Sequence, residues 1–183
     1  MLNFKNIDIG IDVDGVLRDF VSGVCTAYNI ETGNIAHPRE IPTYQIFDYL
    51  GIKDKNSFVN KYAKTLFLNT DEMPNAYKVN ELKNYGKVHI ITSQNKGLEK
   101  ITLDWLDQHD IYYDDIHFTW DKKQVDVDFM LDDYPENLYK MNKHVVKVCY
   151  DAPYNKNWKG WRVDDIGGYI DIIKYLTKEP NEI

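Results

Sequence analysis

Short apolar runs alternate with amphipathic segments along most of the 183-residue chain. The runs are apolar or rich in β-branched residues, and turn-forming or polar residues follow each of them, as is typical of buried parallel strands. Four runs are clear, and a fifth, "DIHFT" at 115–119, is weaker. The clear ones are "IDIGI" at 7–11, "KVHIIT" at 87–92, "DVDFML" at 126–131 and "HVVKVC" at 144–149.

The segments between and after these strands have helical patterns. The apolar residues of "GLEKITLDWLDQHD" recur at the spacing of one helix face. A second segment begins at Pro74 and ends at Gly86, which is the usual punctuation of a helix. A short helix after Pro135 and a closing helix in "DDIGGYIDIIKYL" complete the set. This alternation predicts an α/β fold, a Rossmann-like parallel sheet with helices on both faces.

The interval between the first two clear strands is too long for a single strand-helix-strand unit. A strand-helix-strand unit takes about 30 residues or somewhat more, yet the whole stretch from Asp12 to Lys87 separates the first two clear strands. "DKNSFVNKYAKTLFL", with Asp54 as a candidate N-cap, indicates that the extra structure is helical. We therefore expect a core domain made of residues 1–17 and 74–183, with a small helical cap, 18–73, inserted after the first strand and lying over the strand ends.

Composition narrows the class of protein. Twenty-two Lys and Arg against 29 Asp and Glu give a formal charge of −7, which disfavours binding of long nucleic acid or acidic membranes through a basic face. The two cysteines belong to no metal-binding motif, and no window approaches the length of a membrane span. The N-terminus has no secretory pattern, so the expected location is the cytoplasm.

Polar residues follow the predicted strands at the point where each strand ends. Because the carboxyl ends of parallel strands share one edge of the sheet, these side chains should meet there. Asp12 and Asp14 follow the first strand, and Thr92 and Ser93 lie at the end of the strand at 87–92. Lys122 closely follows the weaker strand at 115–119, and Asp132 and Asp133 follow the strand at 126–131.

Such a set predicts a phosphate-binding metal site. Four carboxylates crowded together repel one another unless some are protonated or a cation lies among them. Mg²⁺ prefers oxygen ligands, and the hydroxyls and the lysine suit phosphate oxygens. Each feature alone has an ordinary explanation as a turn, a helix cap or a solvated charge. Their joint occurrence, each at a strand end, favours catalysis.

The four features resemble the signature motifs of the haloacid dehalogenase (HAD) phosphatase superfamily. They appear in the same order, as "IDVDGV", "IITS", Lys122 and "MLDD", and the resemblance covers about residues 7–150. "DVDGVLRDF", "FTWDK" and "MLDDYPEN" are also similar to motifs of the 5'(3')-deoxyribonucleotidases and their bacterial and phage relatives. The spacing of ten residues between Lys122 and Asp132 fits that family.

The resemblance implies a role for each residue. Asp12 would be the nucleophile that forms an aspartyl-phosphate, and Asp14 the general acid and then the general base. Phe20 would contact the nucleobase. The resemblance assigns Mg²⁺ to Asp12, the backbone carbonyl of Asp14, Asp132 and Asp133, and the phosphoryl oxygens to Thr92, Ser93 and Lys122.

The expected function is therefore hydrolysis of small-molecule nucleoside monophosphates by a Mg²⁺-dependent 5'(3')-deoxyribonucleotidase. One alternative is a phosphatase acting on a polynucleotide 3'-end or on a non-nucleotide phosphate. Another, of a different class, is a non-enzymatic phospho-receiver, which also uses aspartate, a hydroxyl and a lysine on a parallel sheet. The sequence does not decide between a monomer and a homodimer.

Two aromatic groups keep two interpretations each. Tyr44, Phe47 and Tyr49 either face a nucleobase or form the core of the cap. Tyr154, Trp158 and Trp161 either border the active site or pack across the sheet edge.

Overall fold

A six-stranded parallel sheet forms the centre of the computed structural model, which describes residues 7–177. The strand order is β3-β2-β1-β4-β5-β6, and each neighbouring pair is parallel. The predicted α/β fold is confirmed, although the three-residue edge strand β6 was not predicted. The strands are β1 (Asp8–Ile11), β2 (Lys87–Thr92), β3 (Asp115–Phe118), β4 (Phe129–Asp132), β5 (Val146–Tyr150) and β6 (Trp161–Val163).

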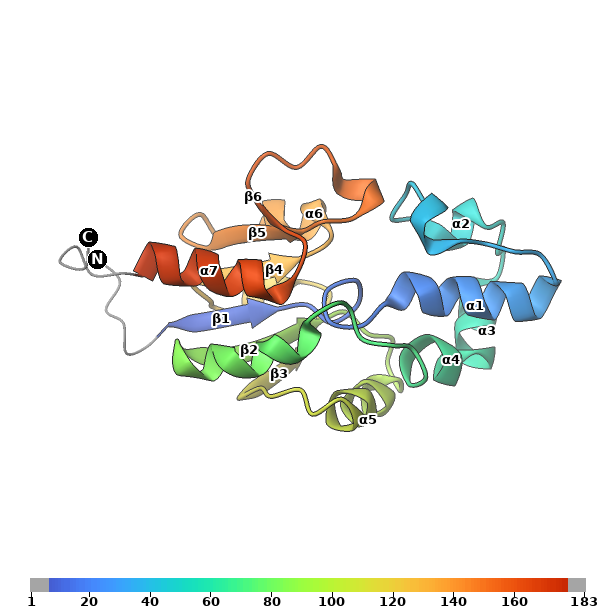
Figure 1. The fold of residues 1–183 in the computed structure, drawn as a ribbon. Coiled ribbons are helices and arrows are strands. Elements are labelled where there is room, and N and C mark those ends of the chain that lie inside the picture. Colours follow the sequence, from blue (N-terminus) through green and yellow to red (C-terminus); the bar gives the residue numbers. More distant parts are fainter. Residues whose placement is uncertain (1–6, 178–183) are drawn as a thin grey trace.

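Seven α-helices accompany the sheet in the described residues (Figure 1). Four of them lie between β1 and β2: α1 (Phe20–Thr32), α2 (Ile46–Tyr49), α3 (Lys55–Lys61) and α4 (Ala63–Phe67). The other three are α5 (Glu99–Gln108), α6 (Pro135–Lys140) and α7 (Ile166–Thr177). Short 3-10 segments occur at Pro38–Glu40, Lys122–Gln124 and Pro153–Asn155. Within residues 7–177, no helix is long and apolar enough to cross a membrane.

The segment after Pro74 differs in type from the predicted α-helix. It is a 3-10 segment, Ala76–Asn84. Its buried residues, Ala76, Val79 and Leu82, recur every three positions. A 3-10 helix has three residues per turn, so this spacing places all three side chains on one side. The period of three, rather than 3.6, explains the difference.

The two faces of the sheet bury different sets of side chains. Alternate residues of β1 and β2, such as Ile9, Ile11 and Ile90, join the main core together with residues of α5 and α7. Ile91 of β2 points to the opposite face, where it joins a smaller cluster with Met130 and with Leu138 of α6. This alternation is the normal consequence of the two-residue period of a strand.

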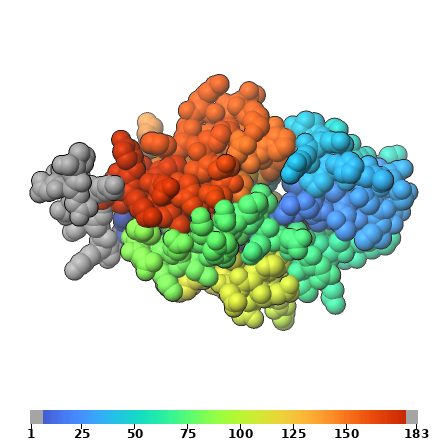
Figure 2. Space-filling view, in the orientation of Figure 1, coloured from blue at the N-terminus to red at the C-terminus, as the bar shows by residue number. Residues whose placement is uncertain are grey.

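The helices between β1 and β2 have a core of their own. Residues from α1 to α4, including Val24, Phe47, Phe58 and Leu66, form a separate buried cluster. Leu98 and Ile101 pack against this cluster, whereas Trp105 and Leu106 of α5 join the main core. Figures 1 and 2 show this blue-to-cyan group, here called the cap helices, beyond the end of the sheet toward which β1 points. The domain boundaries at 18 and 73 stay a prediction.

The chain enters and leaves the cap helices through two hydrogen-bonded segments. Arg18 and Glu72 form an antiparallel bridge. The Asp19 amide donates to the Asp71 carbonyl (2.9 Å), and the Met73 amide donates to the Leu17 carbonyl (2.7 Å). We call these paired segments, 17–19 and 71–73, the connecting ribbon.

Candidate active site

Asp12 lies at the carboxyl end of β1, where the chain leaves the sheet. Its amide donates to the Leu131 carbonyl at 3.0 Å, which continues the pairing with β4. Its carboxylate accepts the Val13 amide at 2.8 Å and is only 6% exposed. Gly15 then turns the chain with a φ of +81°, and a Cβ at this position would collide with the Asp133 carboxylate. The turn therefore requires glycine and leaves the Asp14 side chain on the cavity wall.

Lys122 lies between two of the predicted carboxylates. Its Nζ is 2.8 Å from Asp12 Oδ2 and 2.7 Å from Asp132 Oδ2, and the lysine is buried. Burial alone would lower the pKa of Lys122, but the attraction of Asp12 and Asp132 outweighs it and raises the pKa. The ammonium therefore stays charged beside both carboxylates.

Three buried carboxylates crowd next to this lysine. Oxygens of Asp12, Asp132 and Asp133 all lie within 4.8 Å of one another. Burial raises the pKa of Asp12 to about 7, with Lys122 opposing the shift and Asp132 adding to it. Burial, together with the charges of Asp132 and Asp12, also raises the pKa of Asp133 well above its usual range. One lysine does not offset three carboxylates, so the cluster favours a further cation.

The oxygen atoms of this cluster fit Mg²⁺. Asp133 Oδ1 is buried and has no hydrogen-bond partner among the described residues. A buried carboxylate oxygen without a partner is costly unless a cation satisfies it. Asp12, Asp132 and Asp133 could thus hold the ion.

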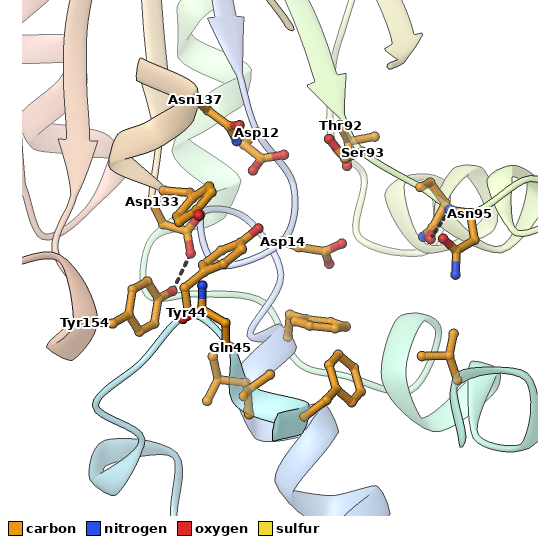
Figure 3. A pocket seen from close by; sticks show the side chains of 18 of the residues that line it. Asp12, Asp14, Tyr44, Gln45, Thr92, Ser93, Asn95, Asp133, Asn137 and Tyr154 are labelled. Carbon is orange, nitrogen blue, oxygen red and sulfur yellow. Dashed lines mark hydrogen bonds between the residues drawn. The ribbon is translucent and has the colours of Figure 1, made fainter. Parts of the chain in front are cut away.

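Neighbouring side chains fix the orientation of these carboxylates, and the sequence had not singled them out. Asn137 Nδ2 donates to Asp132 at 3.0 and 3.3 Å, and the Tyr134 amide donates to Asp132 Oδ1 at 2.8 Å. The Tyr154 hydroxyl donates to Asp133 (Figure 3). The signal for Asn137 was present in "MLDDYPEN", where the asparagine falls one helical turn after the acidic pair.

The two hydroxyl residues follow on from β2. Thr92 is the last residue of β2 and is almost fully buried, and both Thr92 and Ser93 line the same cavity as Asp12. Neither of them caps a helix, because α5 begins only at Glu99. Ser93 Oγ donates to the Thr119 carbonyl at 3.0 Å, so this hydroxyl would have to turn in order to donate to a phosphate.

A cavity of about 320 Å³ lies between the sheet edge and the cap helices. Figure 3 shows Asp12, Asp133 and Thr92 at one end of it, the rings of Tyr44 and Tyr154 near Asp133, and further aromatic rings away from Asp12. Phe20 lines the cavity and stacks on Phe67, with ring centroids 5.6 Å apart at 19°. Phe47 belongs both to the cavity wall and to the cap core. The cavity thus joins an ionic end to an apolar end.

A second aromatic group closes another side of the cavity. Tyr44 stacks on Tyr134 with ring centroids 3.7 Å apart, and Tyr154 meets Tyr44 edge-on. Tyr49, in contrast, is exposed and does not line the cavity. Trp158 packs against Tyr139 of α6. The two aromatic residues after β5 therefore differ in position, because Tyr154 borders the cavity while Trp158 packs against α6.

Arg18 is a buried charge that sequence reasoning did not single out. It is fully buried, and its Nε donates to Asp14 Oδ1 at 2.7 Å. Its Nη1 donates to the Phe67 carbonyl at 2.8 Å, and its guanidinium lies over the rings of Phe67 and Trp105. An arginine after a turn is usually exposed, so no local pattern indicated this role. The contact fixes the Asp14 carboxylate from the side of the cap helices.

The fold is similar to that of solved haloacid dehalogenase-like hydrolases. A haloacid dehalogenase-like hydrolase from Streptococcus pneumoniae has a TM-score of 0.65 and 14% identity, with 94% of this chain and 99% of that chain covered. A HAD-type hydrolase from Bacillus subtilis, solved with bound magnesium, has a TM-score of 0.63 and 11% identity, with 93% and 99% covered. At such identities, these likenesses show the fold.

Sequence comparison specifies the family. The family described as "5' nucleotidase, deoxy (Pyrimidine), cytosolic type C protein" matches residues 5–178, and the chain belongs to it. A Chlorobaculum tepidum protein provisionally named 5'(3')-deoxyribonucleotidase is 26% identical, with 93% of this chain and 91% of that protein covered. The chain is thus a phosphoric monoester hydrolase of the 5'-nucleotidase type, and family membership implies a small-molecule nucleotide substrate. The phospho-receiver alternative is wrong.

Proposed function

We propose that this protein is a Mg²⁺-dependent phosphomonoesterase that hydrolyses deoxynucleoside or nucleoside monophosphates to nucleoside and phosphate. The observation that carries the proposal is the position of Asp12, which lies between Lys122 and two further carboxylates at the ionic end of a cavity with aromatic rings at its other end. The name of the Chlorobaculum tepidum relative supports the deoxyribonucleotide substrate.

The reaction proceeds in two displacements at phosphorus. An Asp12 carboxylate oxygen attacks the phosphorus, and the bond to the nucleoside oxygen breaks as Asp14 gives that oxygen a proton. Asp14 then removes a proton from a water, which attacks the aspartyl-phosphate and releases inorganic phosphate and the Asp12 carboxylate. Splitting hydrolysis in this way lets one carboxylate serve as nucleophile and the other as acid and base.

Other groups bind and orient the phosphoryl oxygens. Thr92, Ser93 and Lys122 donate hydrogen bonds to them, and the lysine offsets their charge. Asp12, Asp132, Asp133 and the Asp14 backbone carbonyl would hold Mg²⁺. When bound, the ion would offset the negative charge of the phosphoryl group. Asn137 keeps Asp132 oriented toward the cluster.

The aromatic end of the cavity binds the nucleobase. Phe20 offers a ring to the cavity, and its stacking on Phe67 keeps that ring in place. A cavity of about 320 Å³ is suited to a small molecule of nucleotide size. The alternative of a polynucleotide 3'-end is disfavoured by the net charge of −7.

A panel of substrates tests the proposal. Phosphate release is measured from purine and pyrimidine nucleoside 5'- and 3'-monophosphates, in ribo and deoxy forms, and from sugar phosphates, with Mg²⁺ and with EDTA. We expect turnover of nucleotides that EDTA abolishes and Mg²⁺ restores. A higher kcat/KM for sugar phosphates would overturn the nucleotide assignment, and full activity in EDTA would overturn the metal dependence.

A separate measurement tests the covalent step. The reaction is quenched with acid during turnover, the protein is digested, and the peptide masses are measured by mass spectrometry. We expect one phosphoryl group on the peptide that contains Asp12. A phosphoryl group elsewhere in the chain would contradict the assigned nucleophile.

A further inference from the structure

A second cluster of metal-ligating side chains lies in β2 and β3, away from the acidic site. It consists of His89, Asp115 and His117, whose ligand atoms all lie within 4.8 Å of one another. His89 pairs with Asp115, and Ile91 pairs with His117, so the three side chains share one face of the sheet. The acidic site, in contrast, lies beyond the carboxyl ends of the strands.

The two imidazole rings face each other at a distance that suits a bound metal. His89 Nδ1 is 3.2 Å from His117 Nε2. Two nitrogens that bind one tetrahedral Zn²⁺ at their usual bond length lie about 3.3 Å apart. Asp115 Oδ2 is 3.9 Å from His89 Nδ1, and its half-exposed carboxylate has room to move closer.

Asp8 fixes the tautomer that metal binding needs. The Asp8 carboxylate oxygen Oδ1 lies 2.7 Å from His89 Nε2 and accepts a hydrogen bond from its N–H, a tautomer that leaves the lone pair of His89 on Nδ1, toward His117. Metal-binding histidines almost always donate their second ring N–H to a carboxylate, a carbonyl or a water.

Two simpler interactions also involve the proposed ligand atoms, a hydrogen bond and an ion pair. His117 could donate a hydrogen bond to His89 Nδ1, which also accounts for the 3.2 Å distance. Lys87 Nζ lies 2.5 Å from Asp115 Oδ2, and a metal would displace it. Lys87 is half exposed and can turn into solvent.

We propose that His89, His117 and Asp115 bind a divalent transition metal of the Zn²⁺ class at a site separate from the Mg²⁺ site. Imidazole nitrogens select such metals, whereas the carboxylates of the acidic cluster suit Mg²⁺. Solvent reaches the partly exposed Asp115 and completes the coordination. The metal joins β2 to β3, just upstream of Thr92.

Metal titration of the full chain tests this site. The protein is stripped with a chelator and then kept in excess Mg²⁺, which occupies the acidic cluster. Zn²⁺ binding is measured by calorimetry, and Co²⁺ binding by its visible absorption, which reports nitrogen ligands in a four- or five-coordinate site. We expect one Zn²⁺ per chain, together with a rise in the melting temperature.

Variants separate the site from other metal-binding groups. His117→Ala and His117→Gln should each weaken Zn²⁺ binding roughly 100-fold, and Asp8→Asn roughly 10- to 100-fold. His144→Ala is the matched control, because His144 also pairs with an aspartate, Asp126, but lies on the surface. His144→Ala and Asp12→Asn should both bind Zn²⁺ as the original chain does.

Three results would overturn the proposal. The first is that no Zn²⁺ binds in excess Mg²⁺, which leaves the two histidines as a hydrogen-bonded pair. The second is that both His117 variants, each folded by circular dichroism, bind Zn²⁺ as well as the original chain. The third is that Asp12→Asn alone abolishes binding, which assigns the ion to the acidic cluster.

Discussion

The two walls of the cavity are made in different ways. On the sheet side, segments far apart in sequence bring buried ionisable groups within hydrogen-bonding distance, since Lys122 lies 2.8 Å from Asp12 and 2.7 Å from Asp132. On the cap side, neighbouring helices contribute apolar and aromatic rings such as Phe20 and Phe67. Parallel strands thus bring distant charges together, while a local helical cluster gives the cavity its shape.

We therefore expect the two walls to contribute to different steps, which mutations can test. Changes on the sheet side should affect the rate of the chemical step, and changes on the cap side should affect substrate binding. Arg18 contacts both Asp14 and the Phe67 carbonyl, so its loss should affect both walls.

The largest effect is expected for Asp12→Asn. An amide is not a nucleophile toward phosphorus, so kcat should fall on the order of 10⁴-fold or more. The fold should survive, because asparagine has nearly the same shape and its Oδ1 can still accept the Val13 amide. Steady-state kinetics and the melting temperature check both statements. A variant that keeps most of its activity contradicts the proposed function.

Arg18→Met should mainly lower stability. Removing the guanidinium leaves Asp14 and the Phe67 carbonyl without their donor inside the protein. Loss of one partner of a buried ion pair costs about 3–5 kcal/mol, and the part-exposed Asp14 places this variant at the low end. Urea unfolding measures the change. Arg39→Met, at an exposed arginine, is the control and should leave the free energy of unfolding nearly unchanged.

Phe20→Ala should separate binding from chemistry. If Phe20 contacts the base as proposed, removing its ring should raise KM for nucleotides roughly tenfold, about the energy of one aromatic contact. The kcat for a small aryl phosphate, which cannot reach the cap side, should stay near that of the original chain. Ile30→Ala on the exposed side of α1 is the control. Equal losses with both substrates would contradict a role for Phe20 in base binding.

The smallest effect is expected far from both walls, at Asp165. Its Oδ1 accepts the Gly168 amide at 2.9 Å at the start of α7, so Asp165→Ala should cost ~1 kcal/mol of stability and leave kcat and KM unchanged. The hydrogen bond from Gly168, the first of several, lowers the pKa of Asp165. The stabilisation by Asp165 is therefore fully present at pH values above the usual pKa of a carboxyl group. It is lost as the pH falls through the lowered pKa of Asp165.

Urea unfolding at several pH values measures this contribution. Asp171→Ala, at an exposed aspartate of the same helix, should show neither the loss nor the pH dependence. A similar loss for both variants would mean that the Gly168 contact contributes nothing.

The sequence predicted the sheet and its acidic edge, because both follow from local patterns. A buried strand needs only a short apolar run, and parallel strands align their carboxyl ends wherever they lie in the chain. Asp12, Thr92, Lys122 and Asp132 could therefore be expected in one place.

Other features depend on contacts that no local pattern encodes. Burial of Arg18 requires a carbonyl from α4 and two aromatic rings from different segments. The facing of His89 and His117 depends on the register between β2 and β3, which the sequence does not state. The 3-10 segment after Asn75 was mistaken for an α-helix, because its start and stop residues are the same for both.

The connecting ribbon has a consequence for how such a chain can vary. The two ends of the inserted segment lie side by side and are joined by a hydrogen bond from the Asp19 amide to the Asp71 carbonyl. An insertion whose ends meet can lengthen, shorten or be exchanged for another without displacing β1 or β2, because the closure of the loop is supplied by the ribbon itself. Residues 20–70 could therefore be grafted from a relative to change substrate preference without moving the strand ends, provided that the graft keeps a carbonyl acceptor for Arg18 at the position of Phe67.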